Sequence, residues 1–313
     1  MGFKIPLLFW AFMLMTPMSP AWSETGNSDP GPRNGEEAAF LLKEGKSALE
    51  KRDRPGAIRS YTRFVERYPS HSGLKDAYFG LVGALLAEDR IAEASRHAGD
   101  CLNQSWDTSD LNRMRIFAAE AKLKLKDYLH ARLLADELLK SKPDPKQAGL
   151  ARSIRFQSLL EDKQFEAAEE ELDRLDEHLK SSPDTVLSSQ LPGFRMVFTL
   201  RHCTLTHLLK DKTFDESELL DYFGQKNLCF KSALTEAPQV NDASVLKEWC
   251  ESFTGLNHEV EKMRIDSFLK EKIRKDLKGT FEFSKGIHVE LEKCYRPYQP
   301  KKSNRSRRLR KKT

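Results

Sequence analysis

Four segments of eleven residues decide the fold: RPGAIRSYTRF at 54–64, IAEASRHAGDC at 91–101, YLHARLLADEL at 128–138 and FEAAEEELDRL at 165–175. Each begins 37 residues after the one before it. An alanine stands three residues into every segment, at Ala57, Ala94, Ala131 and Ala168. Larger residues follow it mainly at spacings of four and seven, which put side chains on one face of a helix. We therefore expect each alanine to begin the buried face of a helix packed closely on the preceding one.

This repeat predicts an all-α fold, a solenoid of helical hairpins over residues 36–183. One such hairpin cannot bury its apolar face alone, so the four must stack. Hydrophobic residues make up 39% of the chain and charged residues 32%, a mixture that suits amphipathic helices with one hydrated face. Strand signals are almost missing.

The first copy resembles a tetratricopeptide repeat. Gly45, Ala57, Tyr61 and Pro69 stand at the glycine, alanine, aromatic and proline positions of that motif. The interval of 37 is longer than the usual 34. The segment Arg67–Ser70 is similar to bacterial envelope members of the family, such as the outer-membrane assembly lipoprotein and the periplasmic cell-division coordinator. The resemblance implies a non-enzymatic scaffold that binds a protein or peptide in a concave groove.

In such arrays the first helix of each pair lines the concave face, and side chains off its buried face can meet a ligand. The resemblance puts nine residues there. They are Lys46, Glu50, Phe79, Leu86, Arg113, Glu120, Lys124, Gln157 and Glu161. The predicted groove is mixed in charge with an apolar centre, unlike the uniformly basic channel that a phosphate backbone needs. The alternative is an ordinary solvated surface.

The first 23 residues have the features of a secretory signal peptide. Lys4 precedes a short apolar run over 5–15, and small residues at Ala21 and Ser23 match a cleavage site. The run is too short to cross a bilayer as a helix. We expect cleavage after Ser23, a periplasmic or envelope-associated protein, and a flexible lead over 24–35. No cysteine near the cleavage site could accept a bacterial lipid anchor.

Residues 190–290 are expected to form a C-terminal helical cap or domain. One helix is predicted from Pro192 to Leu209 and another from Asp215 to Ala237. Asn241 or Asp242 then offers a cap for a long helix to about residue 278. Its apolar residues shift in register after Met263.

Four of the five cysteines lie beyond the repeats, and in an exported chain they could form disulfides. Three pairings are open. An antiparallel hairpin that turns near Gln239 would set Cys229 level with Cys250 and favours that bond; Cys203 with Cys294 is the companion pair. Cys101 is expected to be a buried apolar residue of the second repeat.

Catalytic and metal sites are not indicated, and no cofactor is expected. His202, Cys203 and His207 provide too few ligands on one face for a metal site. No phosphate-binding loop, nucleophile elbow or zinc-protease helix occurs.

The chain ends in a basic segment, expected to be a disordered tail over 297–313. It holds eight cations and no acid between residues 301 and 312: Lys301, Lys302, Arg305, Arg307, Arg308, Arg310, Lys311 and Lys312. Because the whole chain carries +5, the remainder sums to about −3, from 5 − 8. Behind a signal peptide, such a tail could contact anionic lipid, lipopolysaccharide or a wall polymer. The sequence thus leaves two functions open: a partner-binding scaffold tethered by its tail, or a direct binder of polyanions, with nucleic acid the less expected ligand.

Overall fold

The computed structural model describes residues 32–206, 215–263, 265–284, 287 and 291, and all of its regular structure is helical. Two compact units meet in sequence between Ser182 and Pro183. The predicted all-α class is confirmed, since these described ranges contain no strand.

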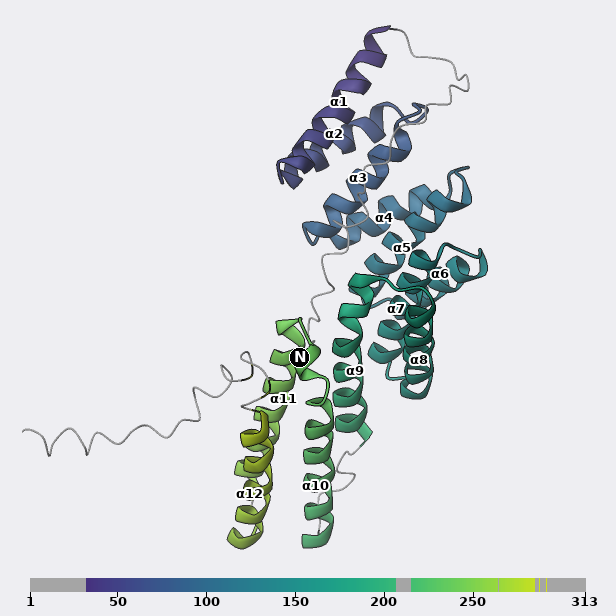
Figure 1. Cartoon of the computed structure of the whole chain (residues 1–313). Helices are drawn as coiled ribbons and strands as arrows, with labels where there is room; N and C mark the ends of the chain where they lie inside the picture. The colour runs from purple at the N-terminus through teal and green to yellow at the C-terminus, as the bar shows by residue number, and fades with distance from the viewer. Residues whose placement is uncertain (1–31, 207–214, 264, 285–286, 288–290, 292–313) are drawn as a thin grey trace, which may run out of the picture. The chain divides into compact units, whose positions relative to one another are not determined.

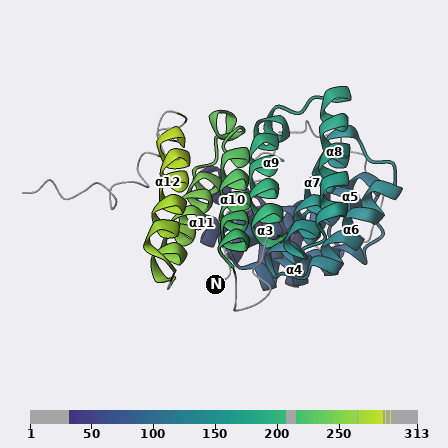
Figure 2. The same ribbon diagram turned by 90° about the horizontal axis from the view of Figure 1, so that it is seen from below.

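The first unit is a stack of four helical hairpins that follow one another in chain order (Figure 1). The hairpins are α1 (Pro32–Glu50) with α2 (Arg54–Arg67), α3 (Leu74–Ala87) with α4 (Ile91–Leu102), α5 (Thr108–Lys124) with α6 (Tyr128–Lys140), and α7 (Pro145–Glu161) with α8 (Phe165–Ser181). The second helices begin at intervals of 37 residues, as the sequence predicts, and α7 and α8 lie side by side (Figure 2). Helix α1 begins at Pro32, inside the predicted flexible lead. These hairpins are consistent with the tetratricopeptide resemblance.

The repeated alanines lie at the contacts between helices. All four are fully buried, and the residues four and seven positions later are buried as well. In the first hairpin, the ring of Tyr61 fills the space left by Gly45 and Gly80, where an added Cβ would overlap it. The small residues therefore set how closely the helices approach, because interiors are packed without voids.

Consecutive first helices contact each other, α1 with α3, α3 with α5 and α5 with α7, more extensively than any consecutive second helices do. A stack whose first helices are closer together curves toward them. We call the side formed by α1, α3, α5 and α7, turned away from the second helices, the first-helix face.

The turn inside each hairpin is held by one residue with a left-handed backbone. Arg52, Asp89, Lys126 and Lys163 have φ of 61°, 57°, 64° and 62°. The next backbone N–H then donates to a carbonyl near the end of the first helix, for example Gln164 to Leu159 at 2.9 Å. This is a helix C-terminal motif in which glycine is usual, because a Cβ strains the left-handed conformation.

Glycine at these turns should stabilise the protein. We expect Arg52→Gly and Lys163→Gly each to raise the free energy of unfolding by about 0.5–1 kcal/mol, since relief of the left-handed strain exceeds the entropy that glycine adds to the unfolded chain. Urea denaturation measures the change. Arg52→Ala and Lys163→Ala keep the Cβ and should show no gain; equal stability of the glycine and alanine variants would contradict the explanation.

The second unit consists of α9 (Thr185–Thr206), α10 (Glu216–Ala233), the short 3₁₀ helix η2 (Ala237–Gln239), α11 (Ala243–Lys262) and α12 (Ser267–Ser284). Trp249 lies at its core. The indole stacks on Phe253 at 5.0 Å between ring centroids, and its Nε1 donates to the Phe230 carbonyl at 3.0 Å. A buried tryptophan with its N–H satisfied joins α10 to α11.

Three helix boundaries in this unit differ from the prediction. Helix α10 ends at Ala233 rather than at Ala237, where the separate 3₁₀ helix η2 begins. Helix α9 begins at Thr185 rather than Pro192, because the Asp184 carboxylate accepts from the N–H groups of Val186 and Leu187. The helix continues through Pro192. The predicted end at Leu209 lies outside the described residues.

The long helix predicted to about residue 278 is two helices. Helix α11 ends at Lys262, and Asp266 accepts from the Phe268 N–H at 2.7 Å as a new helix begins. The shift of the apolar register after Met263 marked this break. Phe268, one of the apolar residues after the shift, is exposed.

Candidate functional site

Most of the predicted groove residues share two positions of the repeat. Lys46, Glu120 and Gln157 are separated by multiples of 37, as are Glu50, Lys124 and Glu161. Lys46 and Glu50 are exposed on α1, and Lys124, Gln157 and Glu161 are partly exposed on α5 and α7. The fold therefore repeats these two positions along the first-helix face with side chains of both charges.

Leu86 is not available to a ligand. It is only 3% exposed and shares its repeat position with Leu49, Leu123 and Leu160, which are buried too. The prediction that it lines the groove is wrong by one residue, since Ala87 occupies the register of Glu50 and Lys124.

Phe79 is also largely covered, with 8% of its surface exposed. The rings of Trp106 and Phe117 lie 6.0 and 6.2 Å away, and the Arg113 guanidinium stands 4.2 Å above its ring centroid. A cation over an aromatic face is stabilising. The predicted apolar centre is thus a packed cluster between the second and third hairpins, and Arg113 contributes to it.

Glu120 is the most unusual group on this face. The residue is 8% exposed, and its nearest cation is Lys124, with Nζ 3.8 Å from Oε1. Burial raises the pKa of Glu120 to about 7, although Lys124 acts in the opposite direction. At the same repeat position on α3 stands Gly83, where an added Cβ would meet no atom within 4 Å. A carboxyl group kept at a cost in desolvation is a candidate recognition residue.

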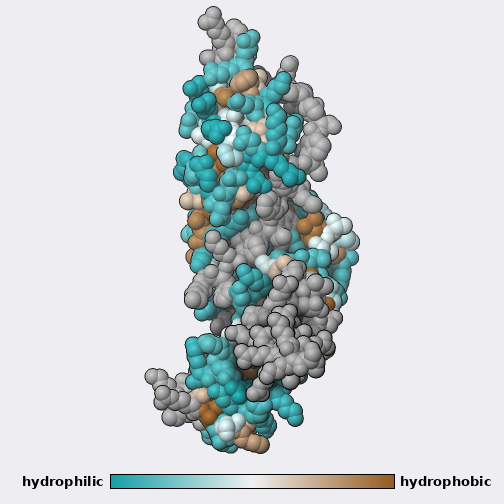
Figure 3. Space-filling view, turned by 90° about the vertical axis from the view of Figure 1, so that its left-hand side faces the viewer, coloured by the Kyte–Doolittle hydropathy of each residue, from teal (hydrophilic) through white to brown (hydrophobic). Residues whose placement is uncertain are grey.

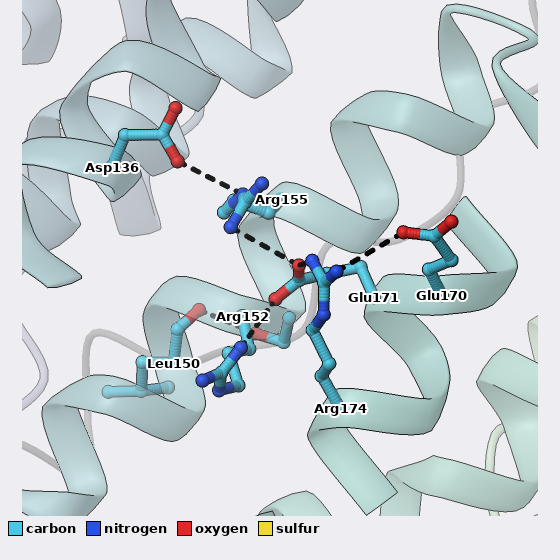
Figure 4. Close-up of polar contacts among 8 residues, drawn as sticks. Asp136, Leu150, Arg152, Arg155, Glu170, Glu171 and Arg174 are labelled. Carbon is cyan, nitrogen blue, oxygen red and sulfur yellow. Dashed lines mark hydrogen bonds and ion pairs between the residues drawn. The ribbon is translucent and has the colours of Figure 1, made fainter. Parts of the chain in front are cut away.

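A second buried carboxylate, missed by the sequence analysis, lies in the last hairpin (Figure 4). Glu171 of α8 has no exposed side-chain surface and is surrounded by three arginines. Its oxygens lie 3.1 Å from Arg152, 3.2 Å from Arg155 and 3.5 Å from Arg174, and Arg155 also contacts Asp136 at 3.1 Å.

The sequence does carry a signal for this site. Ser60 and His97 occupy the same repeat position as Glu171, and both are buried and polar. Ser60 donates to Glu44, which stands at the repeat position of Arg155. Glu171 and its arginines therefore extend a polar contact that the first hairpin also makes between its two helices. Their role is to stabilise the hairpin.

Cys229 and Cys250 are both buried and disulfide-bonded. The predicted antiparallel arrangement of their helices agrees with the contacts of Phe230 with Trp249 and of Tyr222 with Glu259. A bond between Cys229 and Cys250 stays a prediction, which peptide mapping under non-reducing conditions would test. The side chains of Cys203 and Cys294 lie outside the described part of the chain. Cys101 is a buried thiol.

Several other predicted features lie outside the described residues: the signal peptide, most of the flexible lead, His207 and the basic tail with its eight cations. Within the described ranges, no group of histidine, cysteine and acidic residues could hold a metal ion. None of the helices in those ranges is sufficiently long and apolar to span a membrane. On the face seen in Figure 3, the described surface is mostly hydrophilic with small hydrophobic areas.

No protein-family model and no curated protein sequence matches the chain. Among solved structures, it is similar to a tetratricopeptide repeat protein from Parabacteroides merdae, with 14% sequence identity and a TM-score of 0.49. That similarity covers 83% of this chain and 96% of the other.

Proposed function

We propose that this protein is a non-enzymatic scaffold that binds a partner protein or peptide on the first-helix face. The observation that supports it is the repetition of Lys46, Glu50, Lys124, Gln157 and Glu161 at two positions of a continuous layer of helices. Such a layer offers evenly spaced polar contacts to an extended or helical segment.

The charges of this face favour a partner that carries both signs. Lys46 and Glu50 stand one turn apart on α1, and Glu120 and Lys124 one turn apart on α5. A polyanion would be repelled by the more exposed carboxylates of this face, Glu50 and Glu161. A peptide with basic and acidic groups in alternation could match both.

We also propose that the protein is located in the periplasm or cell envelope. The features of residues 1–23 support export to the periplasm or cell envelope, and the eight cations between 301 and 312 support contact with anionic lipid, lipopolysaccharide or a wall polymer. The tail would then hold the scaffold near an anionic surface while the repeats bind the partner.

Site-specific crosslinking tests the binding face. A photoreactive residue at Lys46 or Gln157, on the first-helix face, should capture the same protein in intact envelopes. The control positions Arg63 on α2 and Asp173 on α8 are exposed on second helices and should not capture it. Equal capture from both sets, or none from Lys46 and Gln157, would contradict the proposal.

The second candidate function is direct polyanion binding, which the absence of acids among residues 301–312 favours. Deletion of residues 297–313 separates the two functions. A scaffold without its tail should still be crosslinked to its partner through Lys46. A polyanion binder should lose its ligand together with the salt dependence of binding.

A further inference from the structure

Gly83, in the middle of α3, has free space beside it although it is buried. A Cβ added to this residue would meet no atom within 4 Å. Gly45 and Gly80 differ, because an added Cβ at either position would overlap the Tyr61 ring. Close helix packing therefore explains those two glycines but not Gly83. A glycine inside a helix is destabilising relative to alanine, so this position needs another explanation.

The free space beside Gly83 lies on the first-helix face. At the same repeat position, α1 carries Lys46 and α5 carries Glu120, because both are 37 residues from Gly83. Helix α3 contacts both of these helices. One turn further along α3 stands Ala87, which is also small. We call the space over Gly83 and Ala87, with Lys46 on one side and Glu120 on the other, the α3 notch.

The carboxyl group of Glu120 can accept a further hydrogen bond. Its side chain is only 10% exposed, and the Nζ of Lys124 is 3.8 Å from Oε1, which is too far for a hydrogen bond. Among the residues that the structure describes, no other side chain pairs with this carboxyl group. A buried carboxylate without a hydrogen-bonded cation is costly, and a positively charged donor would relieve that cost.

We propose that the α3 notch receives a lysine or arginine side chain of the partner protein, whose cation pairs with Glu120. This inference rests on the proposed function and names a group that the partner must present. The aliphatic stem would lie over Gly83 and Ala87, where this chain has no long side chain, and the cation would reach the carboxyl group.

The charges around the notch favour a basic side chain over other kinds. An acidic side chain would be repelled by Glu120, and an apolar one would leave that carboxyl group without a donor. Lys46, on the other side of the notch, is exposed, so water and salt screen its charge. The buried carboxyl group therefore dominates the choice.

Selection from a random library of short displayed peptides tests this specificity. The full-length wild type should select peptides with a lysine or arginine at one position, and Gly83→Met, which fills the notch, should lose that preference. Gly99→Met is the matched control, because an added Cβ at Gly99 on α4 also meets no atom within 4 Å. It should select the same peptides as the wild type. Wild-type peptides with no shared basic residue would overturn the inference.

A double-mutant cycle tests the contact with Glu120. In a synthetic peptide from the selection, norleucine in place of the basic residue keeps an aliphatic stem and removes the charge. Calorimetric titration should show about tenfold weaker binding to the wild type after this change, but little change for Glu120→Gln, in which the ion pair is already lost. Asp173→Asn, at an exposed carboxylate on α8, should behave like the wild type. Equal losses for the wild type and Glu120→Gln would overturn the pairing.

Crosslinking separates this inference from the proposed function. A photoreactive residue at Lys46 should capture the selected peptide, which would place the peptide on the first-helix face. Capture of peptides whose basic residue is not coupled to Glu120 would leave the scaffold function intact and overturn the inference alone. If no peptide is selected, or none is captured, the proposed function is contradicted and the inference fails with it.

Discussion

Replacing Glu171 with glutamine should lower the free energy of unfolding by about 3 kcal/mol. The carboxylate is fully buried and lies within 3.5 Å of Arg152, Arg155 and Arg174. Glutamine keeps the shape of the side chain but removes the charge that the three guanidinium groups share. These arginines are partly exposed and can regain some hydration, so the loss should stand at the lower end of the range for a broken buried ion pair. Urea denaturation of both proteins measures it.

The neighbouring residue provides a matched control. Glu170 is 67% exposed and pairs with the same arginine, Arg174, at 3.2 Å. An exposed pair of this kind contributes little, so Glu170→Gln should change stability by less than about 0.5 kcal/mol. Equal losses in the two variants would show that burial of Glu171 adds nothing to its pairing.

The arrangement of the hairpins could be predicted from the sequence because one physical requirement recurs. Where two helices cross closely, only a small side chain fits, and this requirement repeats every 37 residues at Ala57, Ala94, Ala131 and Ala168. Because two helix backbones come close together at this position, every copy keeps the same residue type. The sequence alone therefore shows the repeat.

The candidate face was predicted less well, because its side chains depend on contacts between neighbouring hairpins. Phe79 is covered by Trp106 and Arg113 from later in the chain, and no local spacing shows that. Leu86 stands at the repeat position of the buried Leu49 and Leu123, so the register of the groove lies one residue later, at Ala87. Glu171 was missed because a charged residue on an amphipathic helix is usually hydrated, an assumption that fails where three arginines surround it.

Glu120→Gln should stabilise the protein at alkaline pH and leave it nearly unchanged in acid. Between its ordinary value of 4.5 and its raised pKa of about 7, native Glu120 holds a proton that the unfolded chain has released. The unfolded state therefore binds fewer protons, and the free energy of unfolding falls as pH rises through this window. At about 1.4 kcal/mol per pKa unit, the shift from 4.5 to about 7 makes this loss about 3.5 kcal/mol by pH 8. Urea denaturation from pH 4.5 to 8 of both proteins gives the difference.

Other groups with a raised pKa do not affect the comparison between the wild type and Glu120→Gln. Asp110, whose pKa is also raised by burial, is retained in both proteins and cancels in the difference. A flat difference curve for Glu120→Gln between pH 4.5 and 8 would contradict the role of burial.

Lys124 provides a further test of the Glu120 titration. Its ammonium, 3.8 Å from Glu120, is the charge that limits the rise of the Glu120 pKa. Lys124→Met should therefore extend the window of falling stability above pH 7, and the extension should vanish when Glu120→Gln is added. A cation from a bound partner would act as Lys124 does and lower the pKa of Glu120. If Glu120 contacts such a group, partner binding should strengthen between pH 6 and 8 in the wild type and lose that dependence in Glu120→Gln, which links the desolvation cost on this face to recognition.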